Sequence, residues 1–426
     1  MSKLNRLNFE KTYAYLWAVF LIVFLIAPKI STFVIIISLL FFVISLINKK
    51  VTFRFHRFFI PITALYIAYL IGAFFTNNIP EAHKLLENKL SLLFIPLLFS
   101  FDLENKNQFL RTTVLGLTFG VILSSFFGLI NAIINYSESH SILSFMTIGI
   151  SPIHHPTYFV VFHIFSVSLV LYGYKSKWKG FILYWIIPFV FFSLIIQGLC
   201  LSLAGLLFLF ASVFIIILFF LKKILSQKLF RISVFIVPTI LTGITFSIPQ
   251  FEGEFNGAFK YANSYFSNPE EFIKSREGSL SGTEERLIMW TVTFQEIKKH
   301  PFGVGTGNLD VNLQNRLKSY GLHKLAEKNY NPHNQFLQTT LEIGIFGLII
   351  LGTIIGIVLY QSYILKNGLL LILGTNLLFN SLFESMLQRQ SGIVFYVFWI
   401  VLLLIIFQKS NLEKNEVINT DPILSA

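Results

Sequence analysis

Long apolar segments constrain the fold of this chain more than any other feature of its sequence. Runs rich in Ile, Leu and Phe recur along it, and Phe alone occurs 49 times in 426 residues. Several runs approach the roughly 20 residues that an α-helix needs to cross a bilayer. Only 13% of the residues are charged, against about 25% in soluble domains. We therefore exclude a soluble fold and expect an all-α integral membrane protein.

The runs predict about 12 transmembrane helices, with a large helical extracytoplasmic loop between helices 9 and 10. The predicted spans are 13–27, 31–47, 58–75, 89–101, 112–134, 157–173, 181–197, 201–221, 232–248, 334–360, 367–383 and 391–407. The weakest are the short span 89–101 and the stretch 181–221, whose turn near Gln197 carries no charge. The chain then divides into helices 1–9 at 1–249, an outer loop at 250–331, helices 10–12 at 332–408 and a tail at 409–426.

The positions of the basic residues predict the orientation in the membrane. The net charge is +12, but lysines and arginines lie between apolar runs and not along one face, so the charge does not indicate nucleic-acid binding. Cytoplasmic loops are enriched in Lys and Arg. One set of alternating loops holds most of them, and the other holds only Lys29, Lys84, Lys89 and Arg389. We expect both termini in the cytoplasm and residues 250–331 outside it.

The outer segment carries signals for two helices. Ser281 to Glu284 fits the S-x-x-E capping box that begins a helix. The apolar residues that follow it at three- and four-residue steps, before Pro301, are Leu287, Trp290, Phe294 and Ile297. A second helix is expected from Leu309 to Tyr320. The glycine-rich stretch 302–308 predicts a turn, with an anion-binding nest as one interpretation. The single Cys200 excludes an internal disulfide, so packing must hold this segment.

The junction at residues 331–334 carries the main candidate for chemistry. Asn331 is a good N-cap and Pro332 is favoured at the first helical position, so we expect His333 in the first turn of the tenth membrane helix. The positive end of the helix dipole disfavours imidazolium and attracts anions, which suits a neutral base beside a phosphate site. The alternative is that His333 is an ordinary interfacial residue. The adjacent pair at 154–155 lacks the i, i+4 spacing of zinc ligands, and we predict no metal site.

Several motifs, in this order, resemble the O-antigen ligase and polymerase family of bacterial polysaccharide enzymes. They are Arg286-x-x-x-Trp290, His300-Pro301-x-Gly303-x-Gly305, His333-Asn334-x-Phe336-Leu337 and Glu342-x-Gly344-x-x-Gly347. Two further stretches resemble members from Bacteroidetes-type bacteria, namely His155-Pro156-x-Tyr158 and Glu384-x-Met386-Leu387-x-Arg389-Gln390-x-Gly392.

The resemblance implies a GT-C-like membrane glycosyltransferase, in the first instance an O-antigen ligase. Such an enzyme moves a glycan from an undecaprenyl-diphosphate carrier to the lipid A core on the periplasmic face of the bacterial inner membrane. It works without metal, cofactor or nucleotide sugar, and its partners are the lipid-linked donor, the acceptor glycan and membrane lipid. A polymerase that joins repeat units by the same chemistry is the first alternative, and an enzyme that glycosylates proteins is another.

The chemistry that the resemblance implies sets the expected roles of the site residues. A sugar bonded to diphosphate already has a good leaving group, so the enzyme must take the acceptor's proton and stabilise the departing charge. His333 is the expected general base, and Arg286 the expected diphosphate ligand. The expected substrate-binding residues are Arg389, Asn334, His155, Tyr158 and Glu342. His155 and Tyr158 also suit interfacial anchoring, and Glu342 equally suits a structural hydrogen bond.

One stretch departs from the family pattern. Family members commonly carry Ser-Arg-x-Gly at the outer start of the eighth span, whereas this chain has Leu203 in place of the arginine. Leucine cannot bind diphosphate. The chain then uses another outer cation (Arg389, Arg276 or Lys274), binds a different donor or is impaired. We favour compensation by Arg389, and the alternative for this residue is an ion pair with Glu384.

A transporter or lipid-linked glycan flippase is the alternative from a different functional class. It predicts paired broken helices and ionisable residues near the bilayer midplane, with short loops on both sides. The spans of this chain hold almost no charge, and the polar residues collect in one outer segment. That distribution favours surface chemistry on a membrane-borne substrate.

Overall fold

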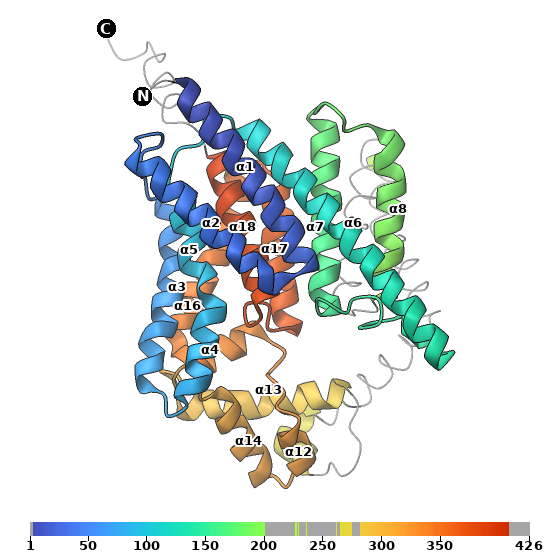
Figure 1. Cartoon of the computed structure of the whole chain (residues 1–426). Helices are drawn as coiled ribbons and strands as arrows, with labels where there is room; N and C mark the ends of the chain where they lie inside the picture. The colour runs from blue at the N-terminus through green and yellow to red at the C-terminus, as the bar shows by residue number, and fades with distance from the viewer. Residues whose placement is uncertain are drawn as a thin grey trace.

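The computed structural model describes residues 3–200, 265–274 and 282–408, with the single residues 226, 227, 229, 236 and 261. Within this part of the chain all regular secondary structure is helical (Figure 1). The α-helices are α1 (Lys3–Ile26), α2 (Pro28–Ile47), α3 (Ile60–Gly72), α4 (Ile79–Lys89), α5 (Ser91–Leu98), α6 (Lys106–Ser139), α7 (Pro156–Lys175), α8 (Leu183–Leu199), α12 (Pro269–Lys274), α13 (Gly282–Lys299), α14 (Leu309–Ser319), α15 (His323–Glu327), α16 (Gln335–Ile364), α17 (Gly368–Phe383) and α18 (Gln390–Phe407). Short 3-10 helices are η1 (Arg57–Phe59), η2 (Ala73–Phe75) and η3 (Ile142–Phe145).

Seven helical segments of the described chain are long and apolar enough to cross a membrane. They are Arg6–Ile26, Pro28–Ile47, Arg57–Phe75, Lys106–Ser139, Pro156–Lys175, Gln335–Ile364 and Gln390–Phe407, while α8 and α17 are apolar but shorter. The expected all-α membrane fold is confirmed. The predicted span 89–101 does not correspond to one helix, because α4 ends at Lys89 and α5 has only 8 residues. The predicted spans 201–221 and 232–248 and the tail lie outside the described residues.

Helix α18 forms the centre of the bundle, and every residue from Gly392 to Ile406 is buried. Trp17 of α1 lies with its ring 4.9 Å from Phe99 and 5.1 Å from Phe398 of α18. Aromatic pairs at such distances contribute about 0.5–1.5 kcal/mol beyond the area they bury. By contrast only 28% of the apolar window of α2 is buried, against 83% for α18. The apolar surface of α2 is therefore suited to contact lipid.

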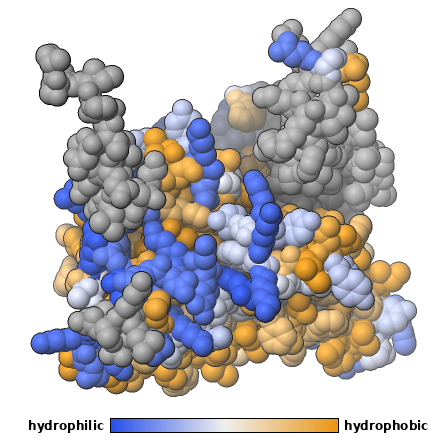
Figure 2. Space-filling model, turned by 90° about the horizontal axis from the view of Figure 1, so that it is seen from above, coloured by the Kyte–Doolittle hydropathy of each residue, from blue (hydrophilic) through white to orange (hydrophobic). Residues whose placement is uncertain are grey.

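The two ends of the bundle differ in character. Arg6 of α1 pairs with Glu104 at 2.8 Å, and Lys106 at the start of α6 donates to the carbonyl of Gln408 just after α18. The start of α1 and the end of α18 therefore share one end, over which hydrophilic side chains gather with hydrophobic ones around them (Figure 2). Helices α12, α13 and α14 lie across the opposite end (Figure 1).

The outer segment has a hydrophobic core of its own. Side chains from α12, α13, α14 and α15 form it, and Leu341 of α16 joins it to the membrane helices. Its fully buried members include Ile273, Ile288 and Val292. The two predicted helices, one between the capping box at 281–284 and Pro301 and one from Leu309 to Tyr320, are present as α13 and α14. Packing and not a disulfide holds this part of the segment, as expected, since Cys200 is a buried free thiol.

The buried face of α13 differs from the predicted stripe. Ile288, Met289 and Val292 are its most buried apolar residues, whereas Phe294 is 53% exposed. Trp290 lies at an edge, where its indole N–H donates to the carbonyl of Pro332 at 2.8 Å. The prediction placed Phe294 on the core face. The prediction was wrong because it assumed that one face of α13 packs on one neighbour. In the structure α13 packs against both α14 and α16, so a different set of its residues is buried.

Helix α16 is interrupted near its outer end. Ile343 and Gly344 have non-helical backbone angles, with φ at +74° for Gly344. The turn after α13 fills the gap, because Val304 and Gly305 donate to the carbonyls of Leu341 and Glu342 and Ile345 donates to Pro301. A Cβ on Gly344 would lie 2.5 Å from the carbonyl carbon of Phe302, so only glycine fits there.

The same hydrogen bonds decide the role of the glycine-rich turn. The amides of residues 303 to 306 donate to the carbonyls of His300, Leu341, Glu342 and Gly72 respectively. Backbone N–H groups that already have acceptors cannot cradle an anion. The interpretation of these amides as an anion-binding nest is therefore wrong, and the turn serves to close the break in α16.

Asp310, in the first turn of α14, gives a pH-dependent contribution to stability. Burial, and then the nearby carboxylates of Glu342 and Glu81, raise its pKa from 3.8 to about 6. A raised carboxyl pKa adds stability that is complete below about pH 3.8 and is lost as the pH rises through about 6. We expect Asp310→Asn to raise Tm at pH 7.5 and to leave it nearly unchanged at pH 4. The control is Glu327→Gln on the exposed end of α15; equal Tm shifts at both pH values for Asp310→Asn would contradict the assignment.

Candidate functional site

Four segments meet beside the outer end of the bundle to form the candidate site. They are the loop before α16, the loop between α17 and α18, the residues that begin α7, and the first turns of α13. The charges of Glu384, Arg389, His333 and Arg286 all act on the imidazole of His155, in that order of strength. The structure therefore brings together His333, Arg286, Arg389 and His155, which the sequence singled out, and adds Glu384.

The backbone around His333 differs from the expectation. The N-cap of α16 is Asn334, whose side chain accepts from the amide of Leu337 at 3.0 Å, and not Asn331. Asn331 instead accepts from the amide of His333 at 2.8 Å, and His333 adopts a left-handed φ of +46°. His333 thus lies just before the helix and not in its first turn. The reason is that two asparagines compete as caps, and Asn331 is used for a turn.

His333 is paired with Glu384. Its Nδ1 lies 3.2 Å from Glu384 Oε2, while Oε1 of the same carboxylate accepts from the amide of Ser385 at 3.1 Å. Burial acts to raise the pKa of Glu384, but the hydrogen bond from His333 and the charges of His333 and His155 outweigh it, so the pKa lies below 4.5. Glu384 is therefore ionised near neutral pH and accepts a hydrogen from Nδ1, which makes Nε2 of His333 the proton acceptor.

His155 lies beside this pair. Burial lowers the pKa of its imidazole below 6.5, and its Nδ1 is buried without a hydrogen-bond partner in the described chain. Its neighbour Tyr158 is 1% exposed and donates its hydroxyl to the carbonyl of Ser385 at 3.1 Å. Tyr158 thus supports the loop that carries Glu384. His154 points elsewhere, towards Ser391 and the carbonyl of Leu25.

The two arginines lack acidic partners within the part of the chain that is described. Arg389 is exposed, and neither it nor the partly buried Arg286 forms an ion pair or side-chain hydrogen bond with a described residue. The alternative pairing of Arg389 with Glu384 is therefore not observed, because Glu384 is engaged by His333. Lys274 is exposed at the end of α12, while Leu203 and Arg276 lie outside the described residues.

Trp290 and Asn334 connect these segments. Trp290, one turn after Arg286 on α13, donates to the carbonyl of the residue before His333. The side-chain amide of Asn334 donates to the carbonyl of Leu382 at 3.0 Å and so links the start of α16 to the end of α17. These contacts fix the loop of His333 relative to the arginine on one side and the glutamate on the other.

A buried polar network behind the site was not predicted from the sequence. Ser385 donates to Gln338 at 2.9 Å, Gln338 donates to Glu342 at 3.1 Å, and Gln388 donates to the same carboxyl oxygen of Glu342 at 3.4 Å. Lys89 completes the network: it is fully buried and donates to the carbonyl of Leu387 and to Gln388. From the sequence, Lys89 was expected only as a charge of an outer loop.

The sequence held a signal for one of the missed residues and little for the others. Glu384 stands inside the quoted motif at 384–392 and is its one acidic residue. Lys89 looked like an ordinary helix-end cation, and its contacts are almost 300 residues away along the chain. No local pattern of residues indicates such a partner. Among the described residues no group of three His, Cys, Asp or Glu side chains is arranged to hold a metal ion.

Comparison with known proteins gives two matches. Residues 188–352 match the family model described as O-Antigen ligase, a stretch that includes Arg286, the glycine-rich turn and His333. The chain is also 28% identical over 194 residues to an uncharacterized protein of Haemophilus influenzae. That match covers 42% of this chain and 46% of the relative, so it spans about half of that protein. The matched family is the one that the motifs resemble, and this match together with the apolar helices indicates a multi-pass membrane protein that is similar to O-antigen ligases over residues 188–352.

Proposed function

We propose that the protein is an O-antigen ligase that transfers a glycan from an undecaprenyl-diphosphate carrier to the lipid A core. The observation that carries the proposal is the His333–Glu384 pair next to two arginines without acidic partners in the described chain. A base beside an unneutralised cationic pair suits a reaction in which a hydroxyl attacks and a diphosphate leaves. The family match over residues 188–352 supports the same class of reaction.

His333 acts as the general base in this proposal. Glu384 accepts the hydrogen on Nδ1 and holds the ring, so Nε2 points its lone pair away from the carboxylate. The acceptor hydroxyl gives its proton to Nε2 while its oxygen forms a bond to the sugar C1. The bond between C1 and the diphosphate oxygen breaks at the same centre, and the electron pair leaves with the diphosphate. No covalent enzyme intermediate is needed.

Arg286 and Arg389 bind the diphosphate in this proposal. A guanidinium offers a planar fork of donors that matches phosphate oxygens. Arg389 compensates for Leu203, because Glu384 does not neutralise it and because it lies close enough to act on His155. The arginine charges, without a metal ion, offset the charge that develops on the leaving group. His155 contributes a nearby ring nitrogen that has no described partner.

The remaining predicted residues position the loops. Tyr158 holds the loop of Glu384 through Ser385, and Asn334 ties α16 to α17. Glu342 belongs to the network behind the loop and not to the His333 pair. We further propose that the protein lies in the inner membrane with both termini cytoplasmic and the site periplasmic. The position of α13 at the end opposite the start of α1 supports this orientation (Figure 1).

Glu384→Gln tests the pairing. The amide keeps the volume but cannot favour the tautomer with hydrogen on Nδ1 as a carboxylate does. We expect the transfer rate to fall on the order of 10²-fold, within the range that general acid–base catalysis contributes, with little change in donor binding. The control is Glu327→Gln on the exposed side of α15. A variant with wild-type turnover would remove Glu384 from the mechanism.

Lipopolysaccharide banding in a deletion strain tests the function. The strain is complemented with the wild-type chain, Arg286→Ala, Arg389→Ala or Leu203→Arg, and membrane expression is checked for each. If the protein is a ligase, the deletion strain should make a complete core without polymer and retain long polymer on the carrier lipid. Complementation with Arg286→Ala should then restore no ladder. A core that carries a single repeat unit in the deletion strain would instead identify a polymerase. Normal ladders in the deletion strain would contradict both.

A further inference from the structure

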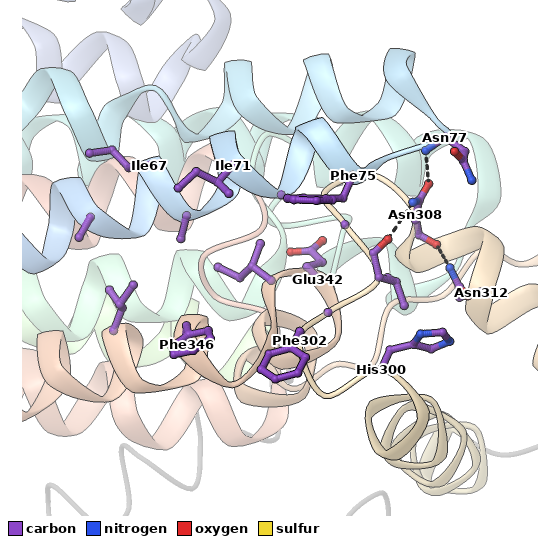
Figure 3. A pocket seen from close by; sticks show the side chains of 18 residues that line it. Ile67, Ile71, Phe75, Asn77, His300, Phe302, Asn308, Asn312, Glu342 and Phe346 are labelled. Carbon is purple, nitrogen blue, oxygen red and sulfur yellow. Dashed lines mark hydrogen bonds between the residues drawn. The ribbon is translucent and has the colours of Figure 1, made fainter.

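A cavity lies apart from the His333 site. Its volume is about 770 Å³, and it lies between α3, η2, α16 and the turn that follows α13 (Figure 3). His333, Arg286 and Glu384 are not among the residues that line it. Such a volume is in the range of sites for small organic ligands.

One part of the cavity is an apolar trench between two membrane helices. Ala64, Ala68 and Gly72 recur every fourth residue along α3, so they lie on one face of the helix, and their small size leaves space for the trench. Phe346 and Ile350 of α16 form the opposite wall. Ile67 and Ile71 on α3 and Phe346 are 47%, 52% and 61% exposed. On a membrane helix such side chains face lipid, so the trench opens sideways to the hydrocarbon of the bilayer.

The outer end of the cavity is polar (Figure 3). There Asn308 Oδ1 accepts from the hydroxyl of Thr76 and from the backbone amide of Asn77, and its Nδ2 donates to the carbonyl of Val304. The side-chain amide of Asn77 and the imidazole of His300 are exposed beside Asn308, and neither forms a side-chain hydrogen bond with a described residue. This end offers hydrogen-bonding groups without a formal charge from lysine or arginine.

Glu342 lies where the polar and apolar parts meet (Figure 3). Its side chain is 1% exposed, and one carboxyl oxygen accepts from Gln338 and Gln388. The other oxygen, Oε2, is buried and forms no hydrogen bond with the part of the chain that the structure describes, although Tyr69 lies beside the carboxyl group. A buried acceptor without a donor costs free energy, so a ligand that brings a hydroxyl to Oε2 is favoured.

We propose that this cavity binds a neutral glycolipid of the surrounding bilayer. One hydrocarbon chain lies in the trench between α3 and α16, and a sugar hydroxyl donates to Glu342 Oε2 while others meet Asn77 and His300. The choice of head group follows from charge. No lysine or arginine of the described residues lines the cavity, and the side chain of Glu342 is part of its lining, so a phosphate head group is disfavoured. The proposal does not rest on the proposed transfer reaction, although Glu342 also belongs to the hydrogen-bonded network behind the loop of Glu384.

Native mass spectrometry of the purified full chain tests the proposal. The protein is reconstituted with equal amounts of monoglucosyldiacylglycerol, phosphatidylglycerol and phosphatidylethanolamine, and the lipid retained after ejection is identified. Wild type should retain monoglucosyldiacylglycerol about tenfold better than either phospholipid. Glu342→Gln should lose about tenfold of that retention, since an amide nitrogen in place of Oε2 cannot accept the hydrogen bond from the sugar hydroxyl. Ala68→Phe, which fills the trench, should lose it as well.

Controls separate binding from general damage. Ile133→Phe, on the lipid-facing side of α6, should retain the glycolipid like wild type, and Tm is measured for every variant. If Glu342→Gln does not fold, Ala68→Phe decides. Equal retention of phosphatidylglycerol by wild type, or unchanged glycolipid retention in folded Glu342→Gln or Ala68→Phe, would overturn the proposal.

Discussion

His333→Ala is expected to reduce glycan transfer on the order of 10²- to 10⁴-fold, the range that a general base contributes. The loss should appear in turnover, because in the proposed mechanism His333 takes the proton of the acceptor and the two arginines bind the donor. The measurement is the initial rate of carrier diphosphate release by purified protein in liposomes, with lipid-linked glycan and lipid A core supplied.

Two further variants make this result specific. His333 has a φ of +46°, a conformation that asparagine adopts readily and alanine does not. His333→Asn should therefore fold with less strain and still lose the reaction. His323→Ala removes an exposed histidine from α15 in the same outer segment and should keep wild-type turnover. Near-normal rates in His333→Asn would refute the base assignment.

Lys89→Met is expected to lower the free energy of unfolding by about 3 kcal/mol, because removing one partner from a buried charged network leaves the rest uncompensated. The substitution orphans the carbonyl of Leu387 and the side-chain oxygen of Gln388, which accept at 2.9 and 3.0 Å. It also removes a positive charge that acts on Glu342. The measurement is thermal unfolding in nanodiscs, with transfer activity recorded beside it, since the same loop carries Glu384.

The same helix supplies a matched control. Lys84→Met removes a lysine whose side chain is 68% exposed and paired with Glu81, and exposed pairs contribute little. Its Tm should stay close to that of wild type. The double variant Lys89→Met/Glu342→Gln should recover part of the loss, because the uncompensated carboxylate is gone. Equal Tm values for the two single lysine variants would show that Lys89 does not support the loop.

Much of the helical architecture is predictable from the sequence. The apolar runs predict α2, α7, α16, α17 and α18 to within a few residues, because burial in lipid and core packing both demand continuous apolar helix. The first span was predicted at 13–27, whereas α1 already begins at Lys3, in a polar stretch that hydropathy does not mark as helix. Local signals also predict α14, whose observed end at Ser319 agrees with the expected Tyr320. The span 89–101 failed because hydropathy alone does not separate a short buried helix from a spanning one.

The details of the site depend on contacts between distant segments. His333 was found because a histidine beside Asn and Pro at a helix start is a local signal. Its partner Glu384 is 51 residues away, and only folding shows that this carboxylate contacts His333 and not Arg389. The break at Gly344 was not predicted either, because its cause is the backbone of Phe302 on another segment.

The break in α16 also bears on the transporter alternative. A broken helix and buried ionisable groups are features that a transporter shares. Here the break lies near the outer end of α16, and backbone from the turn after α13 fills it. Glu342 and Lys89 join one hydrogen-bonded network that supports a loop. These features fit a supported catalytic loop better than a moving gate.

The most direct test of the account uses purified protein in liposomes with an undecaprenyl-diphosphate-linked glycan on one leaflet and lipid A core as acceptor. Covalent product and free carrier diphosphate are measured together with the leaflet of the remaining donor. The account predicts glycan joined to the core, with an equal amount of carrier diphosphate released and no dependence on donor movement. Movement of intact donor between leaflets without any new glycosidic bond would contradict it.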